Sequence, residues 1–316
     1  MIDLKGRVAI VTGAGGGLGR AHALLLAKRG ARLVVNDLGA GAAEVVAEIN
    51  AAGGHAAGAQ ARAAVGSVAD AGFVRRMVED TLQEWGRIDI LVNNAGILRD
   101  KSFAKMELDD FRLVLEVHLM GAAHCTKAVW ETMRKQGYGR IVMTTSSSGL
   151  YGNFGQANYS AAKMGLVGLM QTLAIEGEKH GIRVNCLAPS ASTQMMEGLL
   201  PAEQLDLLRP DLVSPAVLAL VSEQAPTRAI VCAGAGSFEL AHVTLTHGIH
   251  IADQPTAAES LLERWAEIAD RSDERVPAQG FDQSRHELEK AGLRIARAPD
   301  QFDFSPGGID PGTTKG

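Results

Sequence analysis

A glycine-rich turn between an apolar run and a helical pattern constrains the fold more than any other feature of the chain. Residues 7–11 (RVAIV) form a short apolar run, typical of a strand that is covered on both faces. Residues 12–19 (TGAGGGLG) follow at once, and a helix is expected from about Leu18 to Lys28. Glycines in such a turn let the backbone approach a pyrophosphate, which amide groups at the helix N-terminus can bind. A glycine-rich loop alone could be only a flexible turn, but its flanks favour a nucleotide-binding α/β unit.

A carboxylate at the end of the second expected strand indicates which dinucleotide would bind. Residues 31–35 lead into Asn36 and Asp37, and Asp37 lies 20 residues after Gly17. A carboxylate there accepts hydrogen bonds from the ribose hydroxyls of NAD and repels the 2'-phosphate of NADP. No Lys or Arg occurs in residues 12–19 or 38–43 to bind that phosphate. We therefore expect NAD, the alternative being that Asp37 only caps the following helix.

Alternating apolar runs and helical patterns continue along the chain and predict a doubly wound sheet. The further strands are expected near residues 56–65, 88–92, 140–145, 182–187 and 229–232. Helices are expected over 44–49, from a cap at Ser67 or Asp70 to Gly86, and as one long helix over 108–136. The predicted fold class is α/β: a single doubly wound Rossmann-type domain, residues 1–250, around a seven-stranded parallel sheet.

Two later segments differ from this repeating pattern. Residues 192–209 are rich in Met and Leu, and we expect a substrate cover at about 190–212. Residues 251–316 are expected to form a C-terminal extension, helical and irregular, with an amphipathic helix over 258–268 and a polar tail.

Composition excludes several classes of function. The chain has 31 Lys and Arg against 36 Asp and Glu, a formal net charge of -5, so nothing draws it to nucleic acid or an anionic membrane. It has no apolar run of about 18 residues and no secretory signal pattern at its N-terminus. Cys125, Cys186 and Cys232 are far apart, which favours reduced thiols over a disulfide or a zinc site. We expect a cytoplasmic protein with no membrane span and no metal, acting on a small molecule.

A tyrosine and a lysine lie four positions apart at the start of another predicted helix. Tyr159 and Lys163 would share a helix face, and an ammonium beside a phenol lowers the phenol's pKa from about 10. Ser146 follows the fifth expected strand, 13 residues before Tyr159, where its hydroxyl could hold a substrate oxygen. The alternative for Tyr159 and Lys163 is a surface pair on an amphipathic helix.

These motifs together resemble the short-chain dehydrogenase/reductase family. TGAGGGLG at 12–19, NNAG at 93–96, Ser146 and YSAAK at 159–163 occur in the family's order and spacing. The resemblance implies that Tyr159 is the acid/base, that Lys163 binds the nicotinamide ribose and lowers the tyrosine pKa, and that Ser146 positions the reacting oxygen. It also implies a set of residues that line the cofactor: Thr12, Gly13, Gly15, Gly16, Gly17, Leu18, Gly19, Asp37, Val68, Asn94, Ala95, Gly96, Tyr159, Lys163, Pro189 and Thr193.

Longer segments are similar to one branch of the family. Residues 93–106, 117–121, 138–163 and 174–189 resemble the (3R)-hydroxyacyl-CoA dehydrogenase part of multifunctional enzymes of type 2, also described as 17-beta-hydroxysteroid dehydrogenases. The resemblance implies NAD-dependent oxidation of a fatty acyl or steroid side-chain (3R)-hydroxyacyl-CoA to the 3-oxoacyl-CoA. A reductase of 3-oxoacyl thioesters on acyl carrier protein, a hydroxysteroid dehydrogenase and a non-catalytic NAD-binding scaffold remain as alternatives.

The chain departs from the common family pattern at three positions. His118, in the middle of the long predicted helix, replaces the asparagine that usually holds a water in the proton relay, so it is the fourth catalytic candidate. Gly66 stands where an aspartate usually meets the adenine, which leaves Val68 and backbone groups for that contact. Ser190 follows Pro189 where glycine is usual.

Two further features indicate binding partners. Arg99, Lys101 and Lys105 could meet the phosphates of CoA, the alternative being a solvated basic face. The helix that carries Lys163 has a stripe of small residues, including Gly165 and Gly168, which indicates a partner subunit. We expect a homodimer or a homotetramer.

Overall fold

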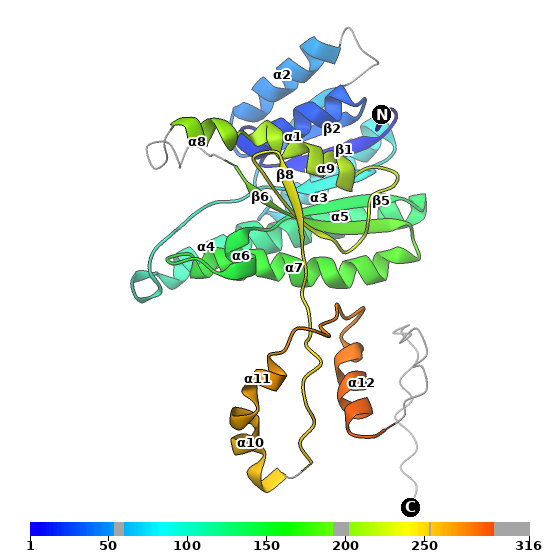
Figure 1. The fold of residues 1–316 in the computed structure, drawn as a ribbon. Coiled ribbons are helices and arrows are strands. Elements are labelled where there is room, and N and C mark those ends of the chain that lie inside the picture. The colour runs from blue at the N-terminus through cyan, green and yellow to red at the C-terminus, as the bar shows by residue number, and fades with distance from the viewer. Residues whose placement is uncertain (54–59, 192–201, 253, 294–316) are drawn as a thin grey trace, which may run out of the picture. The chain divides into compact units, whose positions relative to one another are not determined.

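The structure is a computed structural model that describes residues 1–53, 60–191, 202–252 and 254–293. It divides into two compact units, Met1–Ala241 and His242–Gly316. The first unit is built on one sheet with the strand order β3-β2-β1-β4-β5-β6-β7-β8 (Figure 1). The strands are β1 Val8–Thr12, β2 Arg32–Asp37, β3 Ala61–Val65, β4 Ile90–Asn93, β5 Gly139–Thr144, β6 Ile182–Ser190, β7 Ile230–Gly234 and β8 Ser237–Ala241. Strands β1 to β7 are parallel, and their order reverses between β1 and β4, which confirms the doubly wound α/β fold.

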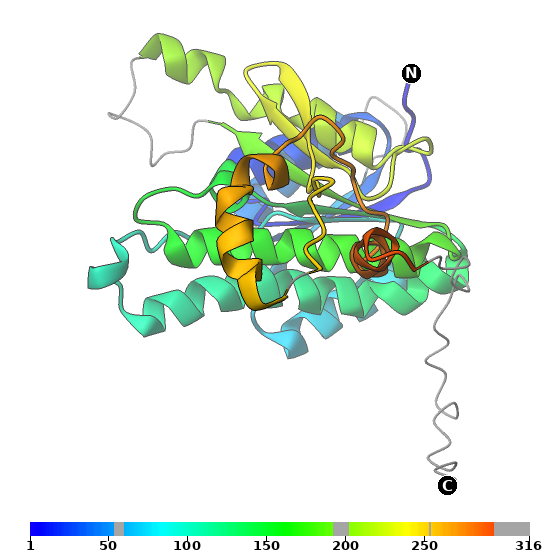
Figure 2. The same ribbon diagram turned by 60° about the horizontal axis from the view of Figure 1, so that its bottom comes forward.

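Helices cover both faces of the sheet. Helices α1 Gly17–Lys28, α2 Gly41–Gly53 and α9 Ser214–Leu220 share one apolar core. Helices α3 Ala71–Trp85, α5 Gly121–Gln136 and α7 Ala157–Glu178 share the other, and α4 Leu108–Leu115 packs beside α7 (Figures 1 and 2). Within β1, Ala9 and Val11 enter the first core and Ile10 the second, as the alternation of side chains along a strand requires. The central strands are buried on both faces, which explains their nearly continuous apolar sequence.

The long helix expected over 108–136 is present, but it is not α-helical throughout. Residues Glu116–Met120 form a π-helical turn between α4 and α5, and His118 lies at its centre. A π turn adds one residue to a helical turn without breaking the helix. Because the apolar pattern on each side still reads as helical, the sequence gives no sign of the extra residue.

The seven parallel strands expected are present, and β8 adds an eighth strand at the edge of the sheet. It pairs antiparallel with β7 through a turn in which Ala235 has a φ of 50° and Gly236 a φ of 76°. Two successive positive φ values are typical of a tight hairpin. Four of the five β8 residues are exposed, Phe238 and Leu240 among them, so β8 has no buried alternate positions to mark it as a strand.

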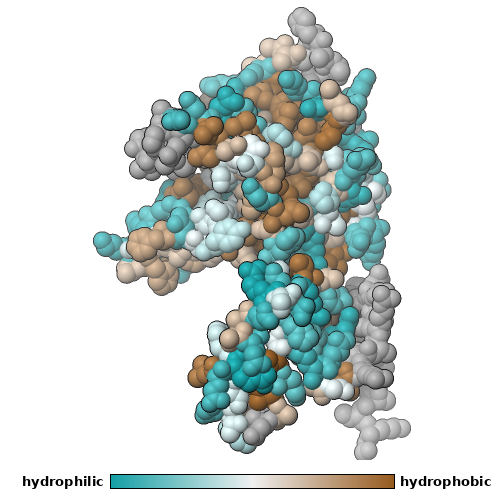
Figure 3. Space-filling view, viewed as in Figure 1, coloured by the Kyte–Doolittle hydropathy of each residue, from teal (hydrophilic) through white to brown (hydrophobic). Residues whose placement is uncertain are grey.

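The second unit has short helices and little buried surface. The amphipathic helix expected over 258–268 is two helices, α10 Ala257–Glu263 and α11 Trp265–Ile268, because Arg264 leaves the helical conformation between them. Helix α12 spans Phe281–Lys290, and His286 is the one buried residue in the described part of this unit. Apolar and polar residues are interspersed over the visible face of both units (Figure 3). The separate roles of residues 1–250 and 251–316 stay a prediction.

Candidate active site

Ser146, Tyr159 and Lys163 come together near the carboxyl end of β5. Ser146 is the N-cap of α6 Ser147–Tyr151, where its hydroxyl accepts a hydrogen bond from the Ser148 amide. Tyr159 and Lys163 lie on the first turns of α7, with the Lys163 ammonium 5.4 Å from the centre of the Tyr159 ring. The Ser146 hydroxyl is close enough to the Tyr159 phenol to act on its pKa. The structure therefore assembles the three residues that the sequence singled out.

Burial has the largest effect on the Tyr159 pKa and raises it, whereas the sequence led us to expect a lowered pKa. The Ser146 hydroxyl acts in the opposite direction to burial. Lys163 is 3% exposed, and burial lowers its own pKa from 10.5 to about 7.

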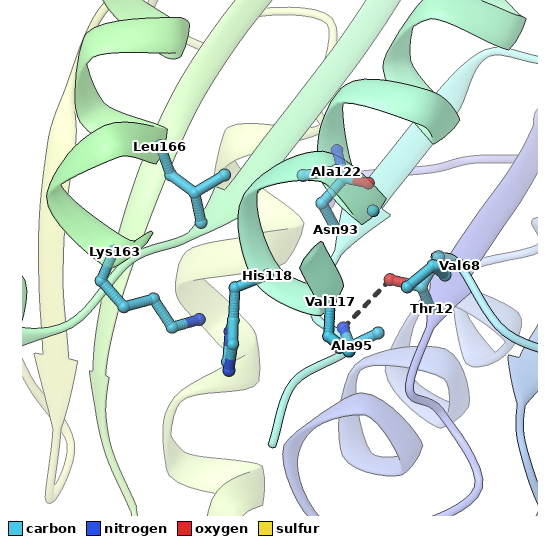
Figure 4. A pocket seen from close by; sticks show the side chains of 10 residues that line it. Thr12, Val68, Asn93, Ala95, Val117, His118, Ala122, Lys163 and Leu166 are labelled. Carbon is cyan, nitrogen blue, oxygen red and sulfur yellow. Dashed lines mark hydrogen bonds between the residues drawn. The ribbon is translucent and has the colours of Figure 1, made fainter. Parts of the chain in front are cut away.

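His118 is the fourth predicted residue that the structure brings to this place. Its ring meets the Tyr159 ring edge-on, with the ring centres 5.2 Å apart and the planes at 90°. Its Nε2 lies 2.7 Å from the carbonyl oxygen of Ile97. Burial and the nearby charge of Lys163 lower the His118 pKa from 6.5 to about 3. Figure 4 shows Lys163 extending from α7 toward this ring, in a pocket also lined by Thr12, Val68, Asn93, Ala95, Val117, Gly121, Ala122 and Leu166.

The glycine-rich turn is joined to the turn after β4 through Asn94. The Asn94 side-chain amide donates to the carbonyl oxygens of Thr12 and Gly13, each at 3.0 Å. The backbone amide of Ala95 donates to the Thr12 hydroxyl at 3.0 Å (Figure 4). The backbone amide of Asn94 donates to the same hydroxyl, also at 3.0 Å. A side chain at Gly19 would collide with the Gly13 carbonyl oxygen, because a Cβ there would lie 2.2 Å away. These contacts explain why glycine and asparagine occur at these positions.

The Asp37 carboxylate lies against the glycine-rich turn, at the carboxyl end of β2. One oxygen accepts a 2.9 Å hydrogen bond from the Gly15 amide, and the other accepts from Leu38 and Gly39 at 2.7 and 3.3 Å. Since α2 begins only at Gly41, Asp37 does not cap that helix. The carboxylate is therefore placed beside the turn where a nucleotide's ribose would lie.

The structure explains the departure at Gly66. A Cβ at Gly66 would lie 2.4 Å from the Phe73 ring, so the aspartate usual in the family has no room here. Val68 is 5% exposed and lines the pocket beside His118. Pro189 and Ser190 are the last two residues of β6. Thr193 lies outside the described residues, as do all of residues 192–201 of the expected cover. The described part of the expected cover contains helix α8, Ala202–Leu207, and a 3₁₀ turn, Pro210–Leu212.

A polar contact that the sequence did not reveal joins the loop after β4 to the start of α7. The Gln156 amide donates a 2.6 Å hydrogen bond to Asp100, and the Gly155 carbonyl oxygen accepts one of 2.9 Å from the Lys101 amide. The Asp100 charge raises the Tyr159 pKa. Partners 56 residues apart give no local signal in a single sequence.

Two of the three basic residues considered for CoA binding are paired within the protein. Arg99 and Lys101 lie 3.7 and 3.2 Å from Asp110. In the described part of the chain, no three His, Cys, Asp or Glu residues are grouped so that they could hold a metal ion. Likewise, none of the helices described is long and apolar enough to cross a membrane.

Comparison with known proteins gives consistent similarities. Residues 7–204 match the short chain dehydrogenase family. The chain is 43% identical over 289 residues to the peroxisomal multifunctional enzyme type 2 of Mus musculus, covering 87% of this chain and 38% of that protein. It is 45% identical over 287 residues to a putative short-chain type dehydrogenase/reductase of Mycobacterium tuberculosis, covering 87% of this chain and 98% of that protein. The solved structure of full-length peroxisomal multifunctional enzyme type 2 from Drosophila melanogaster matches with a TM-score of 0.78 and 39% identity, over 91% of this chain and 50% of that chain. This chain thus spans less than half of the mouse protein.

Proposed function

Since the chain belongs to the short-chain dehydrogenase family of NAD(P)-dependent oxidoreductases, we propose that it oxidises the 3-hydroxyl of a (3R)-hydroxyacyl-CoA to the 3-oxoacyl-CoA. The acyl group is that of a fatty acid or a steroid side chain, and NAD accepts the hydride. The observation that carries this proposal is the assembly of Ser146, Tyr159 and Lys163, with Lys163 lining the same pocket as Thr12 of the glycine-rich turn. The similarity to type 2 multifunctional enzymes supports the substrate class.

The three side chains divide the work of alcohol oxidation. NAD, when bound, supplies the hydride acceptor. The Ser146 hydroxyl hydrogen bonds to the substrate oxygen and holds it beside the phenol. Tyr159, as the phenolate, takes the hydroxyl proton while the C3 hydride departs. Because burial raises the Tyr159 pKa, the positive charge of Lys163 and that of the oxidised nicotinamide are needed to favour the phenolate.

Asp37 supports NAD over NADP. Its carboxylate faces the glycine-rich turn and would repel a 2'-phosphate, and residues 38–43 contain no Lys or Arg to attract one. The chain would hold NAD through the amides of residues 12–19, Asp37, Val68, residues 94–96, Lys163, Pro189 and Thr193. Gly13, Gly15 and Gly19 suit this role, because side chains there would fill the turn.

Contacts with CoA, the oligomeric state and the location are further parts of the proposal. Arg99 and Lys101 share Asp110, whereas Lys105 makes no ion pair with the described residues, so it is the best placed to meet a phosphate. On α7, Gly168 and Thr172 are exposed, which supports a homodimer or homotetramer that covers this stripe. A cytoplasmic location stays a prediction, since the mouse relative's name places that protein in the peroxisome.

The direct test is incubation with NAD and a panel of (3R)-hydroxyacyl-CoA and steroid-CoA substrates, with formation of NADH as the readout. The (3S) epimers and NADP are the controls, and both should be poor substrates. Tyr159→Phe should abolish turnover and leave NAD affinity near normal. Faster reduction of 3-oxoacyl thioesters on acyl carrier protein with NADPH would favour the reductase, and oxidation of free hydroxysteroids the steroid dehydrogenase. Binding of NAD without any turnover would identify a scaffold.

A further inference from the structure

The His118 ring fills the space between the turn after β4 and the Tyr159 ring. On one side it meets Tyr159 edge-on, with the ring centres 5.2 Å apart. On another side a Cβ added to Gly96 would lie 2.2 Å from its Cε1 and 2.8 Å from its Nδ1. The π-helical turn Glu116–Met120 carries the ring into this place. Since any side chain at residue 96 would displace the ring, Gly96 and His118 fit each other.

The Ile97 peptide is the hydrogen-bond partner of His118 Nε2. The Ile97 carbonyl oxygen lies 2.7 Å from Nε2, and the Ile97 amide, which can donate to an unprotonated Nε2, lies 3.0 Å from it. The shorter distance favours the tautomer in which Nε2 carries the proton and donates to the carbonyl oxygen. Nδ1 then carries the lone pair, is buried, and has no hydrogen-bond partner among the described residues.

A proton relay through His118 would need partners that can exchange protons at both ring nitrogens. A backbone carbonyl oxygen accepts a hydrogen bond but has no proton to pass on, so the Nε2 side ends at Ile97. On the Nδ1 side no polar group of the described chain forms a hydrogen bond with the ring. The charged group that acts on the ring is Lys163, whose ammonium opposes a second proton. The geometry therefore favours a fixed neutral ring.

We propose that His118 is a positioning residue that braces the Tyr159 ring against Gly96 and Ile97 and carries no proton during the reaction. This proposal rests on the proposed function, because Tyr159 must be the acid/base for its orientation to matter. It gives the histidine at this position a role different from that of a relay member. The consequence is that the orientation of the phenol depends on the ring's shape and on one backbone hydrogen bond.

The first experiment does not depend on turnover. Ring nitrogen NMR signals of the labelled protein, with His118 assigned by its loss in His118→Asn, report the tautomer directly. We expect a neutral ring with the proton on Nε2 throughout the range from about pH 5 to about pH 8, in which an ordinary histidine titrates. A proton on Nδ1, or titration within that range, would overturn the proposal even if no substrate had been found.

The second experiment separates positioning from proton transfer by kinetics. His118→Phe keeps a ring against Tyr159 and cannot carry a proton, whereas His118→Ala removes the ring. We expect kcat to fall by roughly tenfold for Phe and by about a hundredfold for Ala, with KM and the apparent pKa of the kcat/KM profile unchanged. His180→Asn, on the same chain and away from the site, controls for the loss of a histidine. A loss in His118→Phe as large as in Tyr159→Phe, or a changed apparent pKa, would show that the imidazole exchanges protons.

A paired substitution tests the contact itself and covers the case in which His118→Phe does not fold. Gly96→Ala should reduce kcat strongly, because its Cβ collides with the ring. In a His118→Asn background the same Gly96→Ala change should cost much less, since the smaller side chain leaves room. Thermal unfolding and NAD affinity, measured for all three variants, show whether each is folded. Additive losses in the double variant would contradict the proposed fit.

Discussion

The ammonium of Lys163 donates a 2.5 Å hydrogen bond to the carbonyl oxygen of Thr144, the last residue of β5. The neighbouring Thr145 hydroxyl donates in return to the Lys163 carbonyl oxygen at 2.7 Å. The first turns of α7 and the end of β5 are thus joined from both sides. Lys163 forms no ion pair with a described carboxylate, so a backbone dipole, and no counter-ion, holds the amine beside Tyr159.

We expect the free energy of unfolding of the unchanged protein to rise with pH above neutral pH, and Lys163→Met to lack this rise. Burial lowers the Lys163 pKa from 10.5 to about 7, so above pH 7 the unfolded chain binds a proton that the folded chain has lost. The free energy of unfolding then rises with pH by at most about 1.4 kcal/mol per unit. Urea unfolding should be measured from about pH 7 to about pH 8.5 in both proteins, because the thiols that titrate toward the upper end contribute alike to each and cancel in the difference between the slopes. Lys179→Met, an exposed change near the end of the same helix, is the control. If the free energy of unfolding has the same slope against pH in the unchanged protein and in Lys163→Met, the pKa of Lys163 is not lowered by burial.

His22 should make the protein sensitive to acid. This residue of α1 is fully buried, its Nδ1 lies 2.8 Å from the Ser214 hydroxyl, and burial lowers its pKa from 6.5 to about 3. Below pH 6.5 this histidine binds a proton in the unfolded chain but not in the folded chain. The free energy of unfolding therefore falls as the pH falls, by up to about 1.4 kcal/mol per pH unit. His22→Gln should show a shallower fall between about pH 6.5 and about pH 5 than the unchanged protein. His180→Gln should show the original slope, and a change there equal to that in His22→Gln would refute the role of burial.

Asp100→Asn should lower the apparent pKa of the catalytic base. The Asp100 charge raises the Tyr159 pKa, so its removal favours the phenolate. Asparagine can still accept the hydrogen bond from Gln156, which leaves the loop in place. We expect the kcat/KM profile to shift to lower pH by less than about one unit, because solvent screens the interaction. Asp109→Asn, at an exposed carboxylate paired with Arg112, is the matched control. A shift to higher pH would mean that the profile does not report Tyr159.

The parts of the fold that the sequence predicted are those encoded by local pattern. The apolar run before the glycine-rich turn forms β1. Helix α3 begins after its N-cap Asp70 and ends at Gly86, which has a left-handed conformation. Each of these signals lies within a few residues of the feature that it marks. The π-helical turn at His118 and the edge strand β8 lack such a signal, because the first preserves the helical pattern and the second is exposed.

The residues of the candidate site were predictable, but their electrostatics were not. Tyr159 and Lys163 share a helix face because they are four positions apart, and that much is local. Whether the phenol's pKa rises or falls depends on how deeply β5, α7 and the loop after β4 bury it. The replacement of the usual aspartate by Gly66 is likewise explained only by Phe73, whose ring occupies that space.

Asp37 should set the preference between the two dinucleotides, and two substitutions separate its charge from its support of the glycine-rich turn. Asp37→Asn keeps an oxygen that can accept from the Gly15 amide but removes the charge, so it should bind NADP more tightly while losing little affinity for NAD. Asp37→Ser shortens the side chain and loses the ribose contacts, each worth about 1 to 1.5 kcal/mol, so NAD should bind about 10- to 100-fold more weakly. Calorimetric titration of both variants with NAD and NADP gives the four dissociation constants. If neither substitution changes the ratio of NAD to NADP affinity, the carboxylate does not meet the ribose.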